Sequence, residues 1–219
     1  MHPPVLVARA RAVWESRADG AAFSPVARVA VCPHSRLCPP GWVGVVSIDG
    51  AVIAIAPDPA RAVILQRGLS ALPAAALADG DLLDAAEFRA GPRRPPAEPR
   101  DARDDGLRRF LSRCDAADVE ESGMAGITSP AFAIRDHDQI IAVAGYREWA
   151  GGVAHLTVLT SAPARGRGLG RAAGSAAVAH ALDRGLLPQW RAVPAPSRRV
   201  AAALGFRELG SQASILLRP

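Results

Sequence analysis

The chain contains no lysine, and this absence limits what its positive charge can mean. All 26 basic residues among the 219 are arginines, and the formal net charge is +5. The lack of lysine, together with abundant alanine and 19 prolines, is typical of a GC-rich genome rather than of a surface selected for basicity. The arginine runs are short and separated, and only four Trp, one Tyr and five Phe accompany them. Nucleic-acid binding is therefore not expected.

Cysteine and long apolar runs are scarce as well. Three cysteines are an odd number and do not make a disulfide framework. Cys32 and Cys38 flank His34, but this spacing fits no common zinc pattern, so no metal site is predicted. No apolar run is long enough to span a bilayer, and the first residues lack the pattern of a signal peptide. We expect a cytoplasmic protein without a membrane partner.

Residues 91–100 divide the chain into two parts. Five of these ten residues are Gly or Pro, which excludes a helix interior and predicts an extended linker. The prediction is an N-terminal domain over residues 1–95 and a second domain over residues 96–219. The hydrophobic content of 49% is enough for a core in each.

The N-terminal part shows regular elements but no polar constellation that indicates chemistry. Residues 5–15 have helical spacing, and residues 60–67 predict a second helix that ends at Gly68. Between them, residues 42–56 predict a hairpin whose turn contains Asp49 and Gly50.

The second part alternates helices and strands. Two helices are predicted first, the second over residues 115–121 and ended by Gly123. A meander of three antiparallel strands follows, then a helix over residues 170–184 and a strand over residues 188–193. Ser197 is predicted to cap a helix over residues 198–204, and residues 214–217 to form the last strand. The meander strands cover residues 131–134, 140–146 and 153–160.

A glycine-rich turn lies between the third meander strand and the long helix. Residues 165–170 read Arg-Gly-Arg-Gly-Leu-Gly. Glycines allow positive φ and a close approach of the backbone to a ligand. A helix start adds unpaired N–H groups and the positive end of its dipole. The motif therefore predicts an anion cradle, most naturally for phosphate.

In this order the elements resemble the GNAT family of N-acetyltransferases. The family signature is a strand, then Arg/Gln-x-x-Gly-x-Gly/Ala opening a helix, then a second strand and a helix closing on Gly-Phe. Here Val158-Leu159-Thr160 precedes the glycine motif, and the last helix closes on Gly205-Phe206. The resemblance covers about residues 107–217. It implies an α/β fold with a mixed, mostly antiparallel sheet flanked by helices, and an N-terminal part that is either an α/β extension or a degenerate copy of that fold.

The resemblance also implies acetyl-CoA as the co-substrate. Its pyrophosphate would lie on the glycine motif, and its pantetheine arm between the strands 153–160 and 188–193, which splay apart in this family. The amine acceptor would attack the thioester directly. The implied cofactor-binding residues are Val158, Leu159, Thr160, Arg165, Gly166, Arg167, Gly168, Leu169, Gly170 and Arg171.

Four residues are candidates for proton transfer. His155 is the candidate base and Glu148 its neighbour on the previous strand. Many relatives place a tyrosine acid where this chain has Ala201, and an asparagine where it has Pro194. The acid is then water, Ser197 or Tyr146, or the chain is a poor catalyst. Asp118, Glu120 and Glu121, on the helix that borders the acceptor pocket in this family, form either an amine-attracting wall or a solvated face.

The sequence thus predicts an acetyl-CoA-dependent N-acetyltransferase acting on a primary amine of a small molecule or protein. The alternative is a non-catalytic acyl-CoA-binding or regulatory module. An acetyltransferase acting on aminoacyl-tRNA is a distant third, because only the arginine excess favours it. A homodimer is the further expected partnership.

Overall fold

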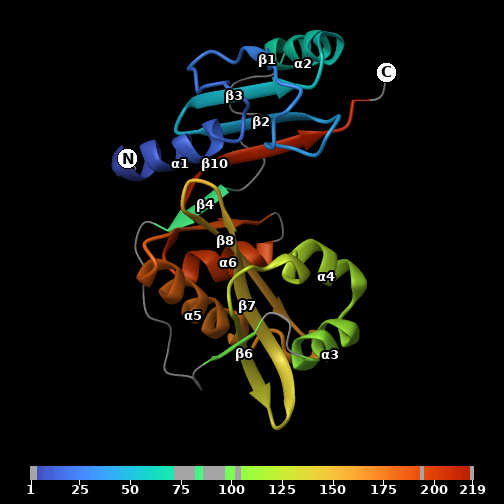
Figure 1. Cartoon of the computed structure of the whole chain (residues 1–219), viewed down its shortest axis with the longest axis vertical. Coiled ribbons are helices and arrows are strands. Elements are labelled where there is room, and N and C mark those ends of the chain that lie inside the picture. Colours follow the sequence, from blue (N-terminus) through green and yellow to red (C-terminus); the bar gives the residue numbers. More distant parts are fainter. Residues whose placement is uncertain (1–3, 72–81, 86–96, 102–104, 193–194, 218–219) are drawn as a thin grey trace. The chain divides into compact units, whose positions relative to one another are not determined.

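The computed structural model describes residues 4–71, 82–85, 97–101, 105–192 and 195–217 (Figure 1). The chain forms two compact units. The N-terminal unit consists of residues 1–83 and 208–219, and the central unit of residues 84–207. The predicted boundary between residues 95 and 96 lies outside the described residues. The return of the C-terminal segment to the N-terminal unit was not anticipated from the sequence.

In the described residues of the N-terminal unit, the chain forms a four-stranded sheet with two helices. The sheet order is β1-β3-β2-β10, with β1 parallel to β3 and the other neighbours antiparallel. Leu65 and Leu69 of α2 pack on one face, where Val43 and Val45 lie, whereas Val46 alternates to the opposite face. The elements are α1 (Pro4–Glu15), β1 (Val29–Val31), β2 (Val43–Ile48), β3 (Ala51–Ala56), α2 (Pro59–Ala71) and β10 (Phe206–Ile215, whose first two residues belong to the central unit).

The turn predicted in this unit is confirmed, and two element ends are corrected. Asp49 and Gly50 both have positive φ, 48° and 77°, as a two-residue hairpin turn of primed type requires. The prediction that Gly68 ends α2 is wrong, because Gly68 has no positive φ and the helix continues to Ala71. The last strand is longer than predicted, since it begins at Phe206 and pairs with β2 from Gly210 onwards.

The described part of the central unit contains the remaining strands and the α-helices α3 to α6. From β9 to β5 the sheet order is β9-β8-β7-β6-β5, with β8 and β9 parallel and the other pairs antiparallel. The predicted α/β class with a mixed, mostly antiparallel sheet is confirmed. The elements are β4 (Leu82–Ala85, divided between the two units), β5 (Glu98–Arg100), α3 (Asp105–Arg113), α4 (Ala116–Ser122), η2 (Met124–Gly126), β6 (Ala131–Asp136), β7 (Gln139–Trp149), β8 (Val153–Thr160), η3 (Ala162–Ala164), α5 (Leu169–Asp183), β9 (Leu187–Arg191) and α6 (Ala195–Ala203).

Helices cover both faces of the central sheet. α3 and α4 lie on one side of β7 and α5 on the other (Figure 1). Leu107 and Phe110 of α3 pack with Val143 and Leu159 of the strands in one buried cluster. Because side chains alternate along a strand, residues 155, 157 and 159 of β8 face α3 and α4, and residues 156, 158 and 160 face α5. Predicted site residues can therefore contact one another only when their side chains lie on the same face of the sheet or at its open edge.

The predicted short helix that ends at Gly123 is confirmed as α4. Asp115 caps α4 by accepting from the N–H of Ala117 at 2.8 Å, and Gly123 ends it with a φ of 64°. The second hairpin turn is tighter than predicted and consists of His137 and Asp138. No helix among the described residues is both long and apolar enough to cross a membrane.

Two predictions in the central unit are wrong. The end of the predicted linker is strand β5, and Pro99 is tolerated there because β5 is the edge strand beside β6. The other residues of that linker, 91–96, lie outside the described part. Ser197 does not cap α6, because the helix already begins at Ala195 and Ser197 is its third residue.

Candidate active site

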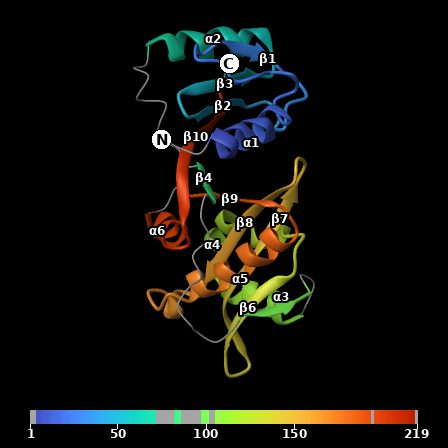
Figure 2. The same ribbon diagram turned by 90° about the vertical axis from the view of Figure 1, so that its left-hand side faces the viewer.

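β8 and β9 diverge, and the divergence creates an opening in the sheet. β9 runs beside β8 (Figure 2) over three paired positions, the last of which joins His155 to Gln189. β8 then continues to Thr160, paired with β7 on its other side. On the β9 side, residues 156–160 have no strand partner among the described residues. Because main-chain groups alternate between the two sides of a strand, those of every second residue in this segment point away from β7, and an extended ligand can pair with them over about 13 Å.

A cavity of about 560 Å³ occupies this opening. Its walls come from β8, the glycine-rich loop, the start of α5, the end of β9, and the helices α4 and α6. The lining residues are Asp118, Glu121, Ser122, His155, Leu156, Thr157, Val158, Leu159, Thr160, Ala164, Arg165, Gly166, Gly168, Leu169, Gly170, Arg171, Trp190, Arg191, Pro196, Ser197, Arg199, Val200 and Ala203.

The glycine-rich loop forms the far end of this cavity. Gly166 and Gly168 adopt left-handed backbone, with φ of 76° and 72°. Gly168 is the N-cap of α5 and supplies no side-chain acceptor for the first N–H groups of the helix. Gly170 keeps α5 close to β8, because a Cβ there would lie 3.1 Å from Thr160 Oγ1. The loop therefore presents free N–H groups and a helix N-terminus to an anion.

The three arginines of this region differ in their surroundings. The guanidinium of Arg165 forms an ion pair with Asp118 of α4, and its Nε donates to the carbonyl oxygen of Thr160 at 3.3 Å. Arg167 is exposed and does not line the cavity. Arg171 lines it, and its buried Nε has no hydrogen-bond partner among the described residues. Arg171 is therefore the predicted cation best placed to meet a phosphate.

His155 lies in the cavity at the point where the strands separate. Its ring stacks on Trp149 of β7, with centroids 4.4 Å apart and planes 21° apart. Asp118 and Glu121 of α4 line the same cavity, whereas Glu120 does not. An imidazole and carboxylates thus lie on the walls of one space.

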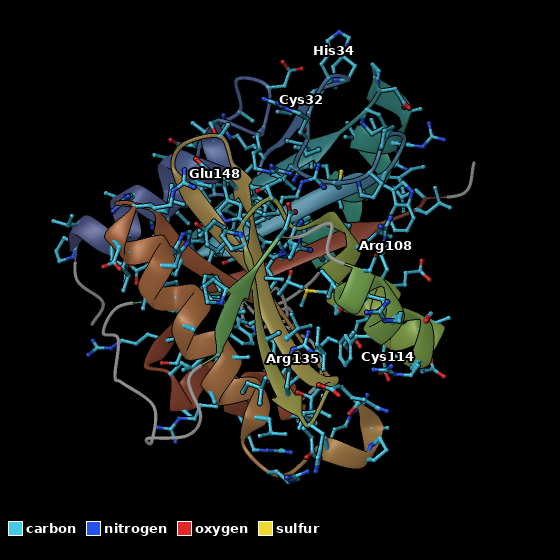
Figure 3. The ribbon with its side chains drawn as sticks, turned by 60° about the horizontal axis from the view of Figure 1, so that its bottom comes forward. Cys32, His34, Arg108, Cys114, Arg135 and Glu148 are labelled. Carbon is cyan, nitrogen blue, oxygen red and sulfur yellow. The ribbon has the colours of Figure 1, made fainter. Side chains whose placement is uncertain are left out.

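Tyr146 and Glu148 lie outside the cavity. Tyr146 is opposite Leu156 in the sheet, so it faces α5, where its hydroxyl hydrogen-bonds to His180 Nδ1 at 2.9 Å. The residue is 0% exposed, and burial raises the pKa of its phenol. Glu148, near the end of β7 (Figure 3), pairs with Arg184 at 3.3 Å. The structure therefore separates these two candidates from His155.

Ser197 lies in the cavity wall and has a partner that the sequence did not reveal. The indole Nε1 of Trp190 donates to Ser197 Oγ at 3.0 Å. No local sequence signal links Trp190 to a serine seven residues later. Ala201 is fully buried and does not line the cavity, and Pro194 lies outside the described residues. No group of three or more metal-ligating side chains is found within the described part of the chain.

Comparison with known proteins agrees with this geometry. Residues 129–211 match the family model described as GNAT acetyltransferase. The resemblance indicated by the motif order is therefore confirmed over this segment, which runs from just before β6 into β10 and holds most of the cavity wall. No curated protein sequence matches the chain.

Three of the solved structures that match the chain are described as acetyltransferases of the GNAT family or GCN5-related N-acetyltransferases. One from Novosphingobium aromaticivorans is 19% identical with a TM-score of 0.47, covering 63% of this chain and 62% of its own. One from Colwellia psychrerythraea is 10% identical with a TM-score of 0.48, covering 70% and 60%. One from Kribbella flavida is 17% identical with a TM-score of 0.45, covering 63% and 56%. The chain thus spans about 60% of the length of these relatives.

Proposed function

We propose that the protein is an acetyl-CoA-dependent N-acetyltransferase that acetylates a primary amine of a small molecule or protein. The observation that carries this proposal is the opening between β8 and β9, which leads from His155 to the glycine-rich loop. The match of residues 129–211 to GNAT acetyltransferases supports it. Acetyl-CoA would supply an activated acyl group as a thioester.

The residues of the cavity fit this ligand. A volume of about 560 Å³ lies within the usual range of small-molecule pockets. The N–H groups of residues 166–170 and the guanidinium of Arg171 would hold the pyrophosphate. The main chain near Val158 and Thr160 would pair with the amide groups of the pantetheine arm, as a strand of the sheet would.

The remaining walls fit an amine acceptor. His155 would accept the proton of the attacking amine, since the ordinary pKa of imidazole lies near neutrality. Glu121 would attract the positively charged form of the amine to the cavity. Catalysis would then rest mainly on positioning the amine nitrogen against the thioester carbon. Tyr146 and Glu148 have no part in this proposal because they lie outside the cavity.

Ligand-dependent thermal unfolding tests the proposal with a matched pair of variants. Gly166 and Gly152 have similar φ, 76° and 71°, and a Cβ at either meets nothing within 4 Å. Gly166→Asp and Gly152→Asp should therefore be equally strained. Only the first puts a negative charge in the glycine-rich loop of residues 165–170, which we call the phosphate cradle. Acetyl-CoA should raise Tm in the wild type and in Gly152→Asp, and not in Gly166→Asp. An unchanged Tm in the wild type would refute the proposal.

One observation favours a second function, a non-catalytic acyl-CoA-binding module. The position where many relatives carry a tyrosine acid is the buried Ala201. Release of free thiol from acetyl-CoA, measured with a panel of primary amines, distinguishes the two functions. Acetyl-CoA binding without thiol release on any amine would favour the module, and one active amine would exclude it.

A further inference from the structure

Trp190 and Ser197 form a hydrogen-bonded pair in the wall of the cavity. The 3.0 Å bond runs from the indole N–H to the serine oxygen. Because the serine oxygen accepts this hydrogen bond, the hydrogen of its own hydroxyl group can still be donated. No residue in the described part of the chain accepts that hydrogen. A hydroxyl held in this way donates in a restricted range of directions.

The indole itself is held firmly. Trp190 is 3% exposed and packs edge-on against Phe206, with ring centroids 5.5 Å apart and planes at 72°. Gly174 of α5 lies against the same ring, since a Cβ there would be 3.6 Å from Trp190 Cζ3. The orientation of the indole N–H is therefore set by packing and not by Ser197 alone.

The pair lies at the end of the opening that is opposite to the phosphate cradle. Trp190 directly follows Gln189, the last residue of β9 that pairs with β8, whereas the cradle begins beyond Thr160 at the other end of β8. A pantetheine arm that starts at the cradle and follows β8 toward residue 156 brings its sulfur atom to the place where the strands meet. Ser197 and Trp190 both line the cavity there.

We propose that the Ser197 hydroxyl donates a hydrogen bond to the sulfur of coenzyme A and that Trp190 is the positioning residue that aims it. This inference rests on the proposed function. It assigns to Ser197 the role at the sulfur atom that a tyrosine has in many relatives, at the position where this chain has Ala201.

The chemistry requires no proton transfer from serine. The amine nitrogen forms a bond to the acetyl carbon, the carbon–sulfur bond breaks, and its electron pair stays on sulfur as a thiolate. The amine loses its proton to the base. The Ser197 hydrogen bond stabilises the negative charge on sulfur while the hydrogen stays on oxygen, as donors placed at a developing charge do. Ser197 is in the first turn of α6, whose positive dipole end favours the same charge.

The affinity for coenzyme A as a function of pH tests this inference without measuring activity. A hydrogen bond that favours the thiolate makes free coenzyme A, which carries a thiol, bind more tightly as the pH rises. Desulfo-coenzyme A lacks the sulfur and reports every other pH effect. Titration calorimetry between pH 6.5 and 9.5 should show the wild-type ratio of the two affinities rising about tenfold in favour of coenzyme A.

Two variants and one control identify the groups responsible. In Ser197→Ala the ratio should stay constant with pH. In Trp190→Phe, which keeps an aromatic ring against Phe206 but removes the N–H, the rise should shrink to a few-fold. Ser112→Ala removes a helical serine hydroxyl outside the cavity, where Ser112 Oγ donates to the carbonyl oxygen of Arg109, and should behave as the wild type.

The outcomes separate this inference from the proposed function. A wild-type ratio that does not change with pH, or a rise that persists in Ser197→Ala, overturns the inference although both ligands bind. Failure of the wild type to bind either ligand overturns the proposed function, and the inference with it. Thermal unfolding of the unliganded variants, with Tm close to the wild type, establishes that each is folded.

Discussion

The guanidinium of Arg165 is paired with the carboxylate of Asp118, 47 positions earlier in the chain. The pair joins the glycine-rich loop to α4, and both residues line the cavity. Arg165 also donates to the carbonyl oxygen of Thr160, at the end of β8. The side chain of Arg165, which was predicted to bind phosphate, is thus already engaged in an ion pair and a hydrogen bond. We infer that these two contacts form a tie that fixes the position of the glycine-rich loop.

This tie predicts a specific pattern of acetyl-CoA affinity. Asp118→Ala and Arg165→Ala should each weaken binding by about two- to fivefold, the range expected of a partly exposed ion pair. The double variant should be no weaker than either single variant, because the same interaction is lost in each. Titration calorimetry on the four proteins measures the cycle.

A second ion pair provides the control for this cycle. Arg108, labelled in Figure 3, forms an ion pair with Asp105 of the same helix α3, and both side chains are exposed and lie outside the cavity. Arg108→Ala should leave the affinity for acetyl-CoA unchanged. If Arg165→Ala weakens binding strongly and Asp118→Ala does not, Arg165 is a phosphate ligand and the tie is not its function.

A substitution at Tyr146 tests whether this residue contributes to the stability of the fold or to catalysis. Tyr146→Phe removes a hydroxyl bonded to His180 on the α5 side of the sheet and leaves the cavity unchanged. We expect the free energy of unfolding to fall by about 1 kcal/mol. Acetyl-CoA affinity and the rate of thiol release should stay within twofold of the wild type. Denaturant unfolding and thiol release measure the two effects, and a large loss of rate at unchanged affinity would return Tyr146 to the catalytic candidates.

The features that the sequence predicted well are encoded by neighbouring residues. The Asp49-Gly50 turn, the end of α4 at Gly123 and the glycine-rich start of α5 each depend on a few adjacent positions, where the backbone preference of the residue type decides the structure. Gly68 shows the limit of such signals. A glycine ends a helix only where the backbone turns left-handed, and the chain around Gly68 stays helical.

The features that the sequence did not reveal depend on which strands and helices lie side by side. The pairing of His155 with Arg147, and of Leu156 with Tyr146, puts His155 and Tyr146 on opposite faces of the sheet. Alternation within each strand was visible in the sequence, but the register that relates the two strands was not. The Arg165–Asp118 and Trp190–Ser197 contacts likewise required the positions of α4 and α6.

Gly170 allows the packing of α5 on β8 to be tested. Gly170→Ala puts a Cβ 3.1 Å from Thr160 Oγ1 and 3.3 Å from Val158 Cγ1, so the start of α5 must shift by a few tenths of an ångström. We expect weaker acetyl-CoA binding. The free energy of unfolding should change by less than about 1 kcal/mol, since alanine is the better helix residue.

Gly68→Ala is the matched control for this change. A Cβ at this position in α2 meets nothing within 4 Å, so the substitution should stabilise the protein by about 0.5–1 kcal/mol and leave the affinity unchanged. The double variant Gly170→Ala/Thr160→Ala removes the closest obstacle and should recover part of the lost affinity. Equal affinity in Gly170→Ala and the wild type would contradict the role given to this contact.

Asp58, at the start of α2, predicts a pH dependence of stability. Its Oδ1 accepts from the N–H of Arg61 at 2.9 Å, and this bond, followed by the Arg61 guanidinium, lowers the pKa of the carboxyl group. A pKa that is lower in the folded than in the unfolded chain stabilises the protein above the unfolded pKa, which is about 3.9. That stabilisation is lost as the pH falls through the folded pKa.

Asp58→Ala should therefore have a lower Tm than the wild type at pH 7, and the difference should narrow below about pH 4. Asp58→Asn keeps an acceptor for the Arg61 N–H without the charge, so its Tm should lie between the two at pH 7. A difference between wild type and Asp58→Ala that stays constant from pH 7 to pH 3 would show that the carboxylate charge does not stabilise the helix.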